Sequence, residues 1–486
     1  MPPINPHHSR PIDVHRWSDH PEIKGLVRDI WDEVFGGGGG KRPGPKPKAR
    51  PRDMLKVVLL DLYVAWTTDP ELSIGVDLNL RKWVAGSRYN ALHLSRAVPG
   101  IIHRLAEEGL IDLSVGSYSG PGASTNRTAR MRAAEPLRAK FREAKFGRID
   151  IRHTDQQECV ILRDRAGREE EYEDTAETLE MRRELRAYND LLRRTFIDLP
   201  GIEEPFIERE INVGVRAGDK TRVPFFPENK FVRRVFSRGD WNCNGRFYGG
   251  WWQQIGSDLR NKIHINGVPT VEVDFRALHV NILSLEQGVT LEGDPYDLSD
   301  SILEGVDRRA QRGYLKTLVL TAINADGDRA AYQAFRDNYP ADDPARHFRN
   351  SDLQRLLDGF LRQAPQLEGA LFKDQGIRLM NVDARIADGV LRAATARNLP
   401  VLCIHDSFVV DYRKTKLLKF LMGLSSRRVV GHTLPIASDW MGWDEVDEQR
   451  RDDYVEARSV QPTRGSMERR KVFEGAFGPI RGDAFN

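Results

Sequence analysis

HINGVPTVEVDFRALH, at residues 264–279, is the stretch that decides the fold. It opens with Asn266-Gly267, the dipeptide that two-residue hairpin turns favour. The residues after this turn alternate between apolar and acidic side chains, as in a strand with one buried face. Asp274 is therefore expected near the end of a half-buried strand, directly before a helix that begins near Ala277.

Two further segments carry charged groups on regular structure. LPVLCIHDSFVVDY, at residues 399–412, predicts a β-hairpin, with His405-Asp406-Ser407 at its tip. RRAQRGYLKTLVLTAIN, at residues 308–324, predicts a helix. Arg312 and Lys316 are four residues apart in this helix and hence lie on one face.

These groups are the ones that phosphoryl transfer requires. The reaction uses two divalent ions about 4 Å apart, and hard cations such as Mg²⁺ take carboxylate oxygens. Asp274 and Asp406 on adjacent strand ends would form a rigid bracket for such ions, while Arg312 and Lys316 would offset the charge of a triphosphate. Each signal has an ordinary structural reading as well, since strand-end aspartates are common turn residues and Arg-x-x-x-Lys is common on solvated helix faces.

The order of these segments resembles motifs A, B and C of the family A DNA polymerases and the related single-subunit RNA polymerases. Two more segments extend the resemblance. NGRFYGGWWQQIGSDLRNKI, at residues 244–263, resembles the signature before motif A, and MNVDARIADGVLRAA, at residues 380–394, resembles the helix before motif C. The similar region spans about residues 240–412 and implies a palm and fingers that use two Mg²⁺ ions, with Mn²⁺ as a substitute.

The resemblance also implies roles for single residues. Asp274 and Asp406 would hold the metal ions, and Arg312 and Lys316 would bind the incoming nucleoside triphosphate, with Lys316 as proton donor to pyrophosphate. His405 would position the primer end. The other positions implied at the nucleotide are His279 and Asn324, and those implied at the primer–template are Arg246, Gln253, Gln254 and Asp383.

The departures from the family pattern keep alternatives open. Ser407 replaces the second acid of motif C, as in the RNA polymerase branch, and Asn324 replaces the aromatic residue of motif B. His279 stands where the DNA branch usually has Glu, and its ring would block a ribose 2′-hydroxyl, which favours deoxynucleotides. An RNA-synthesising or template-independent nucleotidyltransferase is one alternative, and a DNA-binding replication or regulatory protein with an inactive polymerase-like domain is the other.

The N-terminal part has a different pattern. Helical periodicity is present over 54–66 and 78–85, and in 95–113 a third helix is expected to stop at Gly109 and enter a strand. Together with TNRTARMRA at 125–133, this order resembles a winged helix-turn-helix that binds duplex DNA. A winged helix used for protein contacts is the alternative. The arginines expected in its wing are Arg127, Arg130 and Arg132.

We therefore predict an α+β protein with an N-terminal winged helix-turn-helix and an antiparallel palm sheet with helices. The expected segments are a helix with a basic Gly/Pro-rich linker (1–52), a winged-helix-like domain (53–146), a connecting or thumb-like region (147–230), palm and fingers (231–445) and a charged, mobile tail (446–486). The linker is either a solvated tether or a phosphate-contacting arm. The tail contains Arg469-Arg470-Lys471.

Bulk properties set the remaining expectations. The net charge of +3 does not itself demand a polyanionic partner. Three widely spaced cysteines argue against disulfides or a zinc site and suit a reducing cytoplasm, and no apolar run is long enough for a membrane helix. Aromatic and basic residues alternate over 230–252, which predicts either a nucleic-acid channel or a strand pair that buries its rings.

Overall fold

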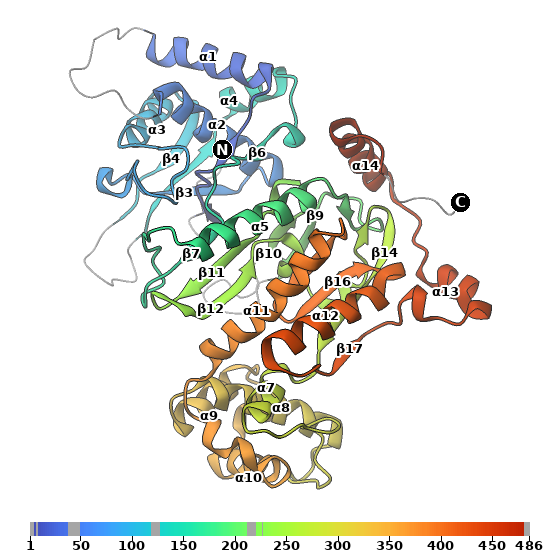
Figure 1. Ribbon diagram of the computed structural model, residues 1–486. Helices are drawn as coiled ribbons and strands as arrows, with labels where there is room; N and C mark the ends of the chain where they lie inside the picture. Colours follow the sequence, from blue (N-terminus) through green and yellow to red (C-terminus); the bar gives the residue numbers. More distant parts are fainter. Residues whose placement is uncertain are drawn as a thin grey trace.

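The computed structural model describes residues 4–5, 8–36, 49–117, 127–210, 220–225 and 227–480. Most of the expected basic linker and the tip of the expected wing lie outside these residues. Buried apolar side chains of the described residues gather in one large N-terminal cluster and one large C-terminal cluster. Figure 1 shows the N-terminal part at one end of the molecule and the helices α8–α10 at the other.

The N-terminal part is a small sheet covered by helices. Its strands are β1 (Ser9–Pro11), β3 (Ser73–Val76), β4 (Ile111–Ser114) and β5 (Ala129–Ala133), in the order β1-β3-β5-β4. Strands β3, β5 and β4 pair antiparallel, while β1 runs parallel to β3. The helices are α1 (Pro21–Phe35), α2 (Pro51–Thr68), α3 (Ala97–Glu107) and α4 (Glu135–Glu143).

The helix α2 forms the centre of this part because it is apolar on almost every side. Its one fully buried acid, Asp61, accepts hydrogen bonds from the guanidinium groups of Arg10 and Arg16 at 2.6–3.0 Å. These ion pairs tie the N-terminal segment to the helix. The helix α3 ends before Gly109, whose φ of +69° lets the chain turn into β4.

The helix expected over 78–85 is absent, and only a short 3₁₀ turn, η1 (Leu80–Lys82), is present there. Asp77 and Asn79 explain the difference. Their side chains accept hydrogen bonds from the backbone N–H groups of Asn79 and Arg81 at 2.8 and 3.0 Å, which satisfies the chain locally without a helix.

The C-terminal part is built on an antiparallel sheet in the order β15-β16-β14-β13-β8. The short strand β17 pairs with the last three residues of β14. Its strands are β8 (Ile197–Asp198), β13 (His264–Ile265), β14 (Val268–Phe275), β15 (Val401–Ile404), β16 (Ser407–Asp411) and β17 (Ile436–Ser438). Both predicted hairpins are confirmed, with Asn266-Gly267 and His405-Asp406 as two-residue turns.

Helices flank this sheet. They are α5 (Ala176–Arg193), α11 (Gly376–Thr395) and α12 (Thr415–Val430), and α11 contacts both of the others. A second sheet, in the order β12-β11-β7, consists of β7 (Val160–Leu162), β11 (Arg233–Ser237) and β12 (Asp240–Tyr248), and α11 contacts β12. A helical lobe holds α7 (Leu278–Glu286), α8 (Arg308–Asn324), α9 (Asp328–Asp337) and α10 (Asn350–Gln363) (Figure 1).

The aromatic residues over 230–252 serve mainly as core. Phe236, Phe247, Trp251 and Trp252 are buried, and Arg234 among them donates to the backbone carbonyl of Gly245 at 2.9 Å. The structure thus favours a strand pair that buries its rings over a nucleic-acid channel at these positions.

The expected mobile tail is instead largely helical, with α13 (Arg451–Arg458) and α14 (Arg464–Phe477). Arg469 on α14 donates to the carboxylate of Asp198 at 2.8 Å, and the Phe473 ring contacts Phe196. These contacts fasten α14 to the chain at β8, the edge strand of the sheet. Residues 481–486 lie outside the described part.

Candidate active site

The sheet brings Asp274 and Asp406 side by side. Asp274 is the next-to-last residue of β14, and Asp406 lies in the turn between β15 and β16. In the register of β14 and β16, Asp274 faces Ser407, the residue after Asp406. The backbone N–H of Phe275 also approaches the carbonyl of Asp406 at 3.4 Å. The two acids therefore lie at neighbouring strand ends of one sheet, as the sequence predicted.

Neither carboxylate has a hydrogen-bond or ion-pair partner among the described residues. Asp274 is open to a cavity, but the protein around the cavity replaces part of its water. This burial raises the pKa of Asp274 above its ordinary value, and the nearby carboxylates of Asp406 and Asp439 raise it further, while Lys316 acts in the opposite direction. Two like charges thus lie close together and lack a neutralising contact from the protein.

A cavity of about 700 Å³ opens above these acids. Besides the strand ends that carry the two acids, its lining comes mainly from the start of α7, the loop before α8 and α8 itself, and Arg246 of β12 and Met380 of α11 also line it. Arg312 and Lys316 lie together on the α8 side, as predicted from their spacing, and Asn324 lines the same side. The Asn324 amide donates to the carbonyl of Leu320 at 2.6 Å and so caps the last turn of α8.

Arg246, His279 and Asp383 form one cluster at the back of the cavity. The Asp383 side chain is fully buried and accepts from Nε of Arg246 at 3.0 and 3.1 Å. It also contacts Nε2 of His279 at 2.8 Å, and the Arg246 and His279 nitrogens approach to 3.4 Å. Arg246 and His279 line the cavity, whereas Asp383 lies behind them. Asp383 is thus engaged inside the protein rather than presented to a ligand.

Ser407, the residue after Asp406, is bonded to an acid of the neighbouring strand β14. Its hydroxyl donates to Oε1 of Glu272 at 2.7 Å. Glu272 is in turn held by the Arg260 guanidinium at 2.8 and 3.0 Å. Glu272 is therefore neutralised within the protein, and it does not line the cavity.

The other positions implied at the primer–template differ in how they are held. His405 has φ +58° in the hairpin turn, and burial, followed by the charge of Arg246, lowers its pKa. Its Nδ1 is buried without a hydrogen-bond partner among the described residues. The Gln253 side-chain amide bonds the backbone of Gly249, Phe247 and Cys403 at 2.9–3.0 Å and hence links β12 to β15. Gln254 is exposed.

Three residues of the site were not found from the sequence. Tyr296 is a buried cavity-lining residue, and burial, followed by Asp294, raises the pKa of its phenol. Asp294 lines the same cavity, and Asp439 follows β17, whose Ala437 pairs with Asp274. The loop and the short strand that carry them have no periodic pattern, so the chain order alone gave no signal.

The donor set of the site suits Mg²⁺. Among the described residues, no group of three or more His, Cys, Asp or Glu side chains is placed to bind one ion. Magnesium is commonly bound by one or two protein carboxylates, with water and substrate phosphates as its other ligands. Two open carboxylates beneath a cavity with cationic walls fit that pattern.

The three arginines of the expected wing have different surroundings. Arg127 is exposed just before β5. Arg130 donates to the hydroxyl of Ser9 at 2.8 Å. Arg132 is buried and forms ion pairs with Glu71 and Asp112 at 2.6 and 3.0 Å, so its guanidinium is engaged within the sheet.

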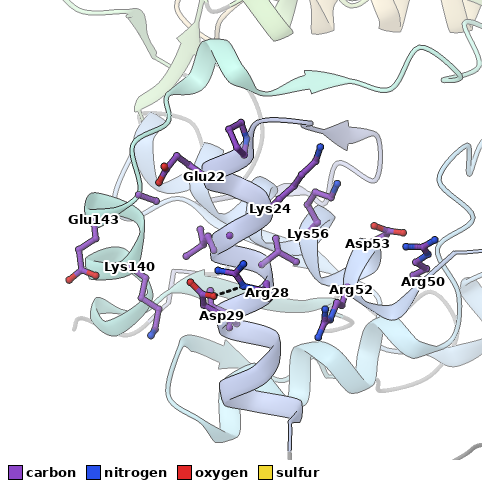
Figure 2. Close-up of a pocket in the computed structure, with 16 residues that line it drawn as sticks. Glu22, Lys24, Arg28, Asp29, Arg50, Arg52, Asp53, Lys56, Lys140 and Glu143 are labelled. Carbon is purple, nitrogen blue, oxygen red and sulfur yellow. Dashed lines mark hydrogen bonds and ion pairs between the residues drawn. The ribbon is translucent and has the colours of Figure 1, made fainter.

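A second cavity, of about 970 Å³, lies in the N-terminal part between α1, the start of α2 and α4. Figure 2 shows basic and acidic side chains intermingled around it, with Arg28 paired to Asp29. Its most buried base, Lys56, donates to the Ser18 carbonyl at 3.2 Å and lies over the Trp17 ring. Acids and bases are thus mixed around this cavity, and Arg28, Arg52 and Lys140 have carboxylate partners.

Comparisons with known proteins leave the family open. No family model matches the chain, and no curated protein matches it. Among solved structures, the POL domain of Pol1 from M. smegmatis, in a complex with DNA primer-template and dNTP, is similar with a TM-score of 0.25 and 9% identity. This match covers 88% of this chain and 67% of that chain. The likeness is too weak to define fold or family. Among the described residues, no helix combines the length and apolar character needed to cross a membrane.

Proposed function

We propose that this chain is a template-directed nucleic-acid polymerase of the family A type, with Asp274 and Asp406 as its metal-binding carboxylates. One observation supports this most strongly. The two acids lie open and side by side, and the basic side chains of Arg312 and Lys316 line the same cavity. An anionic substrate that brings its own divalent ions would be complementary to both walls.

Each group has a distinct task in this proposal. Bound Mg²⁺ would activate a primer 3′-hydroxyl and neutralise phosphate charge. Asp274 and Asp406 hold the ions. Arg312 binds the triphosphate and Lys316 donates a proton to the leaving pyrophosphate. Asn324 and Tyr296 would flank the nucleotide, since both line the cavity.

The cluster behind the cavity sets the shape of the sugar site. Asp383 fixes the His279 ring at the cavity wall, where it would exclude a ribose 2′-hydroxyl and favour deoxynucleotides. Arg246, held by the same carboxylate, would face the primer–template together with His405 and Gln254. Gln253 and Asp383 would act there through the side chains and backbone they hold.

The N-terminal part is proposed to bind duplex DNA as a winged helix covering about 53–146. The order helix, strand, helix and two strands, together with the antiparallel order β3-β5-β4, supports this assignment. Arg127 is the exposed arginine that would contact phosphate. Residues 147–230 would connect this domain to palm and fingers over 231–445, and the combination suits replication or priming of a mobile element.

Primer extension tests the polymerase proposal. A labelled primer–template would be incubated with Mg²⁺ or Mn²⁺ and with dNTPs or rNTPs, using wild type, Asp274→Ala and Asp406→Ala. Template-dependent extension by wild type, lost in both variants, is expected. Asp297→Ala is the matched control, because it removes an exposed acid that contacts Arg308 outside the cavity.

The other outcomes favour the alternatives. A preference for rNTPs, or extension without template, would support an RNA-synthesising or template-independent enzyme, a reading that Ser407 and Asn324 permit. DNA binding without synthesis by wild type under any condition would support a binding protein with an inactive domain.

A further inference from the structure

The loop before α8 places an acid against the proposed phosphate-binding arginine. Asp294 Oδ2 accepts from Arg312 Nε at 2.6 Å and contacts its terminal nitrogen at 2.5 Å. The other oxygen of Asp294 accepts from the backbone N–H of Tyr296 at 3.0 Å. Both Asp294 and Arg312 line the cavity above Asp274. The carboxylate is therefore fixed at both ends, at the place where a triphosphate would bind.

This contact uses the donors of Arg312 that a phosphate would need. The side of a guanidinium formed by Nε and one terminal nitrogen is a fork that binds carboxylate or phosphate oxygens in the same geometry. Lys316, one turn further along α8, has no carboxylate partner among the described residues. The two cavity-lining bases of α8 thus differ, since Lys316 is open and Arg312 is already engaged.

We propose that Asp294 competes with the triphosphate for Arg312 and so limits the affinity of the site for nucleotide. This inference rests on the function proposed above. Asp294 supplies the anionic partner of Arg312 while the site is empty, and nucleotide binding must exchange this carboxylate for phosphate oxygens. The resulting affinity is weaker than Arg312 and Lys316 together would provide.

The same loop and helix offer a matched pair outside the cavity. Asp297 accepts from Arg308 at 2.7 and 3.0 Å, with side chains that are 42% and 63% exposed. Neither residue lines the cavity. Asp297→Asn therefore removes the same charge from the same loop and breaks the same kind of ion pair, but it frees no cavity-lining base.

Equilibrium binding of dATP with Mg²⁺, in the absence of primer–template, tests the inference independently of synthesis. Exposed ion pairs of this kind contribute modestly, so Asp294→Asn is expected to lower the Kd for dATP by roughly 1.5- to 5-fold. Asn keeps the acceptor for the Tyr296 N–H. Asp297→Asn is expected to leave the Kd within error of wild type.

A double-mutant cycle separates competition for Arg312 from general charge removal. Arg312→Gln alone should weaken dATP binding roughly tenfold or more, as expected for a lost charged hydrogen bond. If Asp294 acts through Arg312, Asp294→Asn should have no effect in that background.

Three results would overturn the inference while wild type binds dATP. They are weaker or unchanged binding by Asp294→Asn, an equal gain in Asp297→Asn, and a gain that persists without Arg312. Weaker binding would mean that Asp294 orients Arg312 for phosphate instead of competing with it. Failure of wild type to bind dATP or any other nucleoside triphosphate would reject the proposed function itself, and this inference with it.

Discussion

Asp383→Ala should destabilise the C-terminal core more than most single substitutions would. The Asp383 carboxylate is fully buried, and its oxygens contact Arg246 Nε at 3.0 and 3.1 Å and His279 Nε2 at 2.8 Å. The Arg246 side chain is only 14% exposed, so water cannot easily replace the lost partner. Removing one member of a buried ionic cluster typically costs about 3–5 kcal/mol, and we expect that range here.

Glu286→Ala is the matched control. Glu286 also binds an arginine through both oxygens, Arg378 at 2.7 and 2.9 Å, and Arg378 lies on α11 as Asp383 does. These side chains are 39% and 43% exposed, so the pair should contribute less than about 1 kcal/mol.

Urea unfolding followed by hydrogen exchange and mass spectrometry measures both variants. Peptides from α11 and β12 report on the C-terminal core separately from the N-terminal one. A loss below about 1 kcal/mol for Asp383→Ala, or an equal loss for Glu286→Ala, would refute the argument that burial makes the Asp383 contacts strong.

Three further predictions follow from the charges. Burial and Asp406 raise the pKa of Asp274 in the folded protein. Protonated Asp274 therefore favours the folded state below the unfolded pKa of about 3.9, and this contribution to the free energy of unfolding is lost as pH rises through the higher folded pKa. Asp274→Asn should therefore raise the melting temperature at pH 7 without divalent ions, and calorimetry showing no rise would contradict this. Burial lowers the pKa of His264 to about 4, so the stability of the protein should fall as pH falls from about 6.5 towards 4. The urea midpoint should fall less over this pH range in His264→Gln than in wild type. Arg127→Gln should weaken duplex-DNA binding and reduce its salt dependence by about one ion. Arg132→Gln should instead lower stability and leave the affinity for DNA unchanged, because Arg132 is paired within the sheet. Fluorescence anisotropy at several salt concentrations measures both affinities, and the reverse pattern would show that Arg132 is the DNA contact.

The sequence predicted the parts of the site that depend on local pattern. Alternation and the Asn266-Gly267 turn located Asp274, the hairpin located Asp406, and helical spacing placed Arg312 and Lys316 on one face. These predictions depend only on residues that are close in the sequence, because hydrophobic periodicity and turn-forming residues determine them.

What the sequence missed depends on contacts across long separations. Asp383 was expected at the primer–template, but its partners Arg246 and His279 lie 137 and 104 residues away. Arg132 was expected at DNA, but its partner Glu71 lies 61 residues away. In both cases the burial of the charged side chain decides whether it binds a ligand or another residue of the protein. The pattern of residues along the sequence does not contain that information. The helix expected over 78–85 failed for a local reason, since Asx turns replaced helical hydrogen bonds there.

The acids around the cavity divide into two kinds, and this division is the best physical reason to look for a ligand there. Glu272, Asp383 and Asp294 each have an arginine partner within the protein. Among the described residues, Asp274 and Asp406 have no such partner, although Lys316 lies near enough to Asp274 to affect its pKa. A fold that needed only stability would pair or remove two adjacent like charges, because their repulsion opposes folding. Their retention at a rigid strand end, beneath a cavity with a cationic wall, is what a site would require if its counter-charge arrives with the substrate.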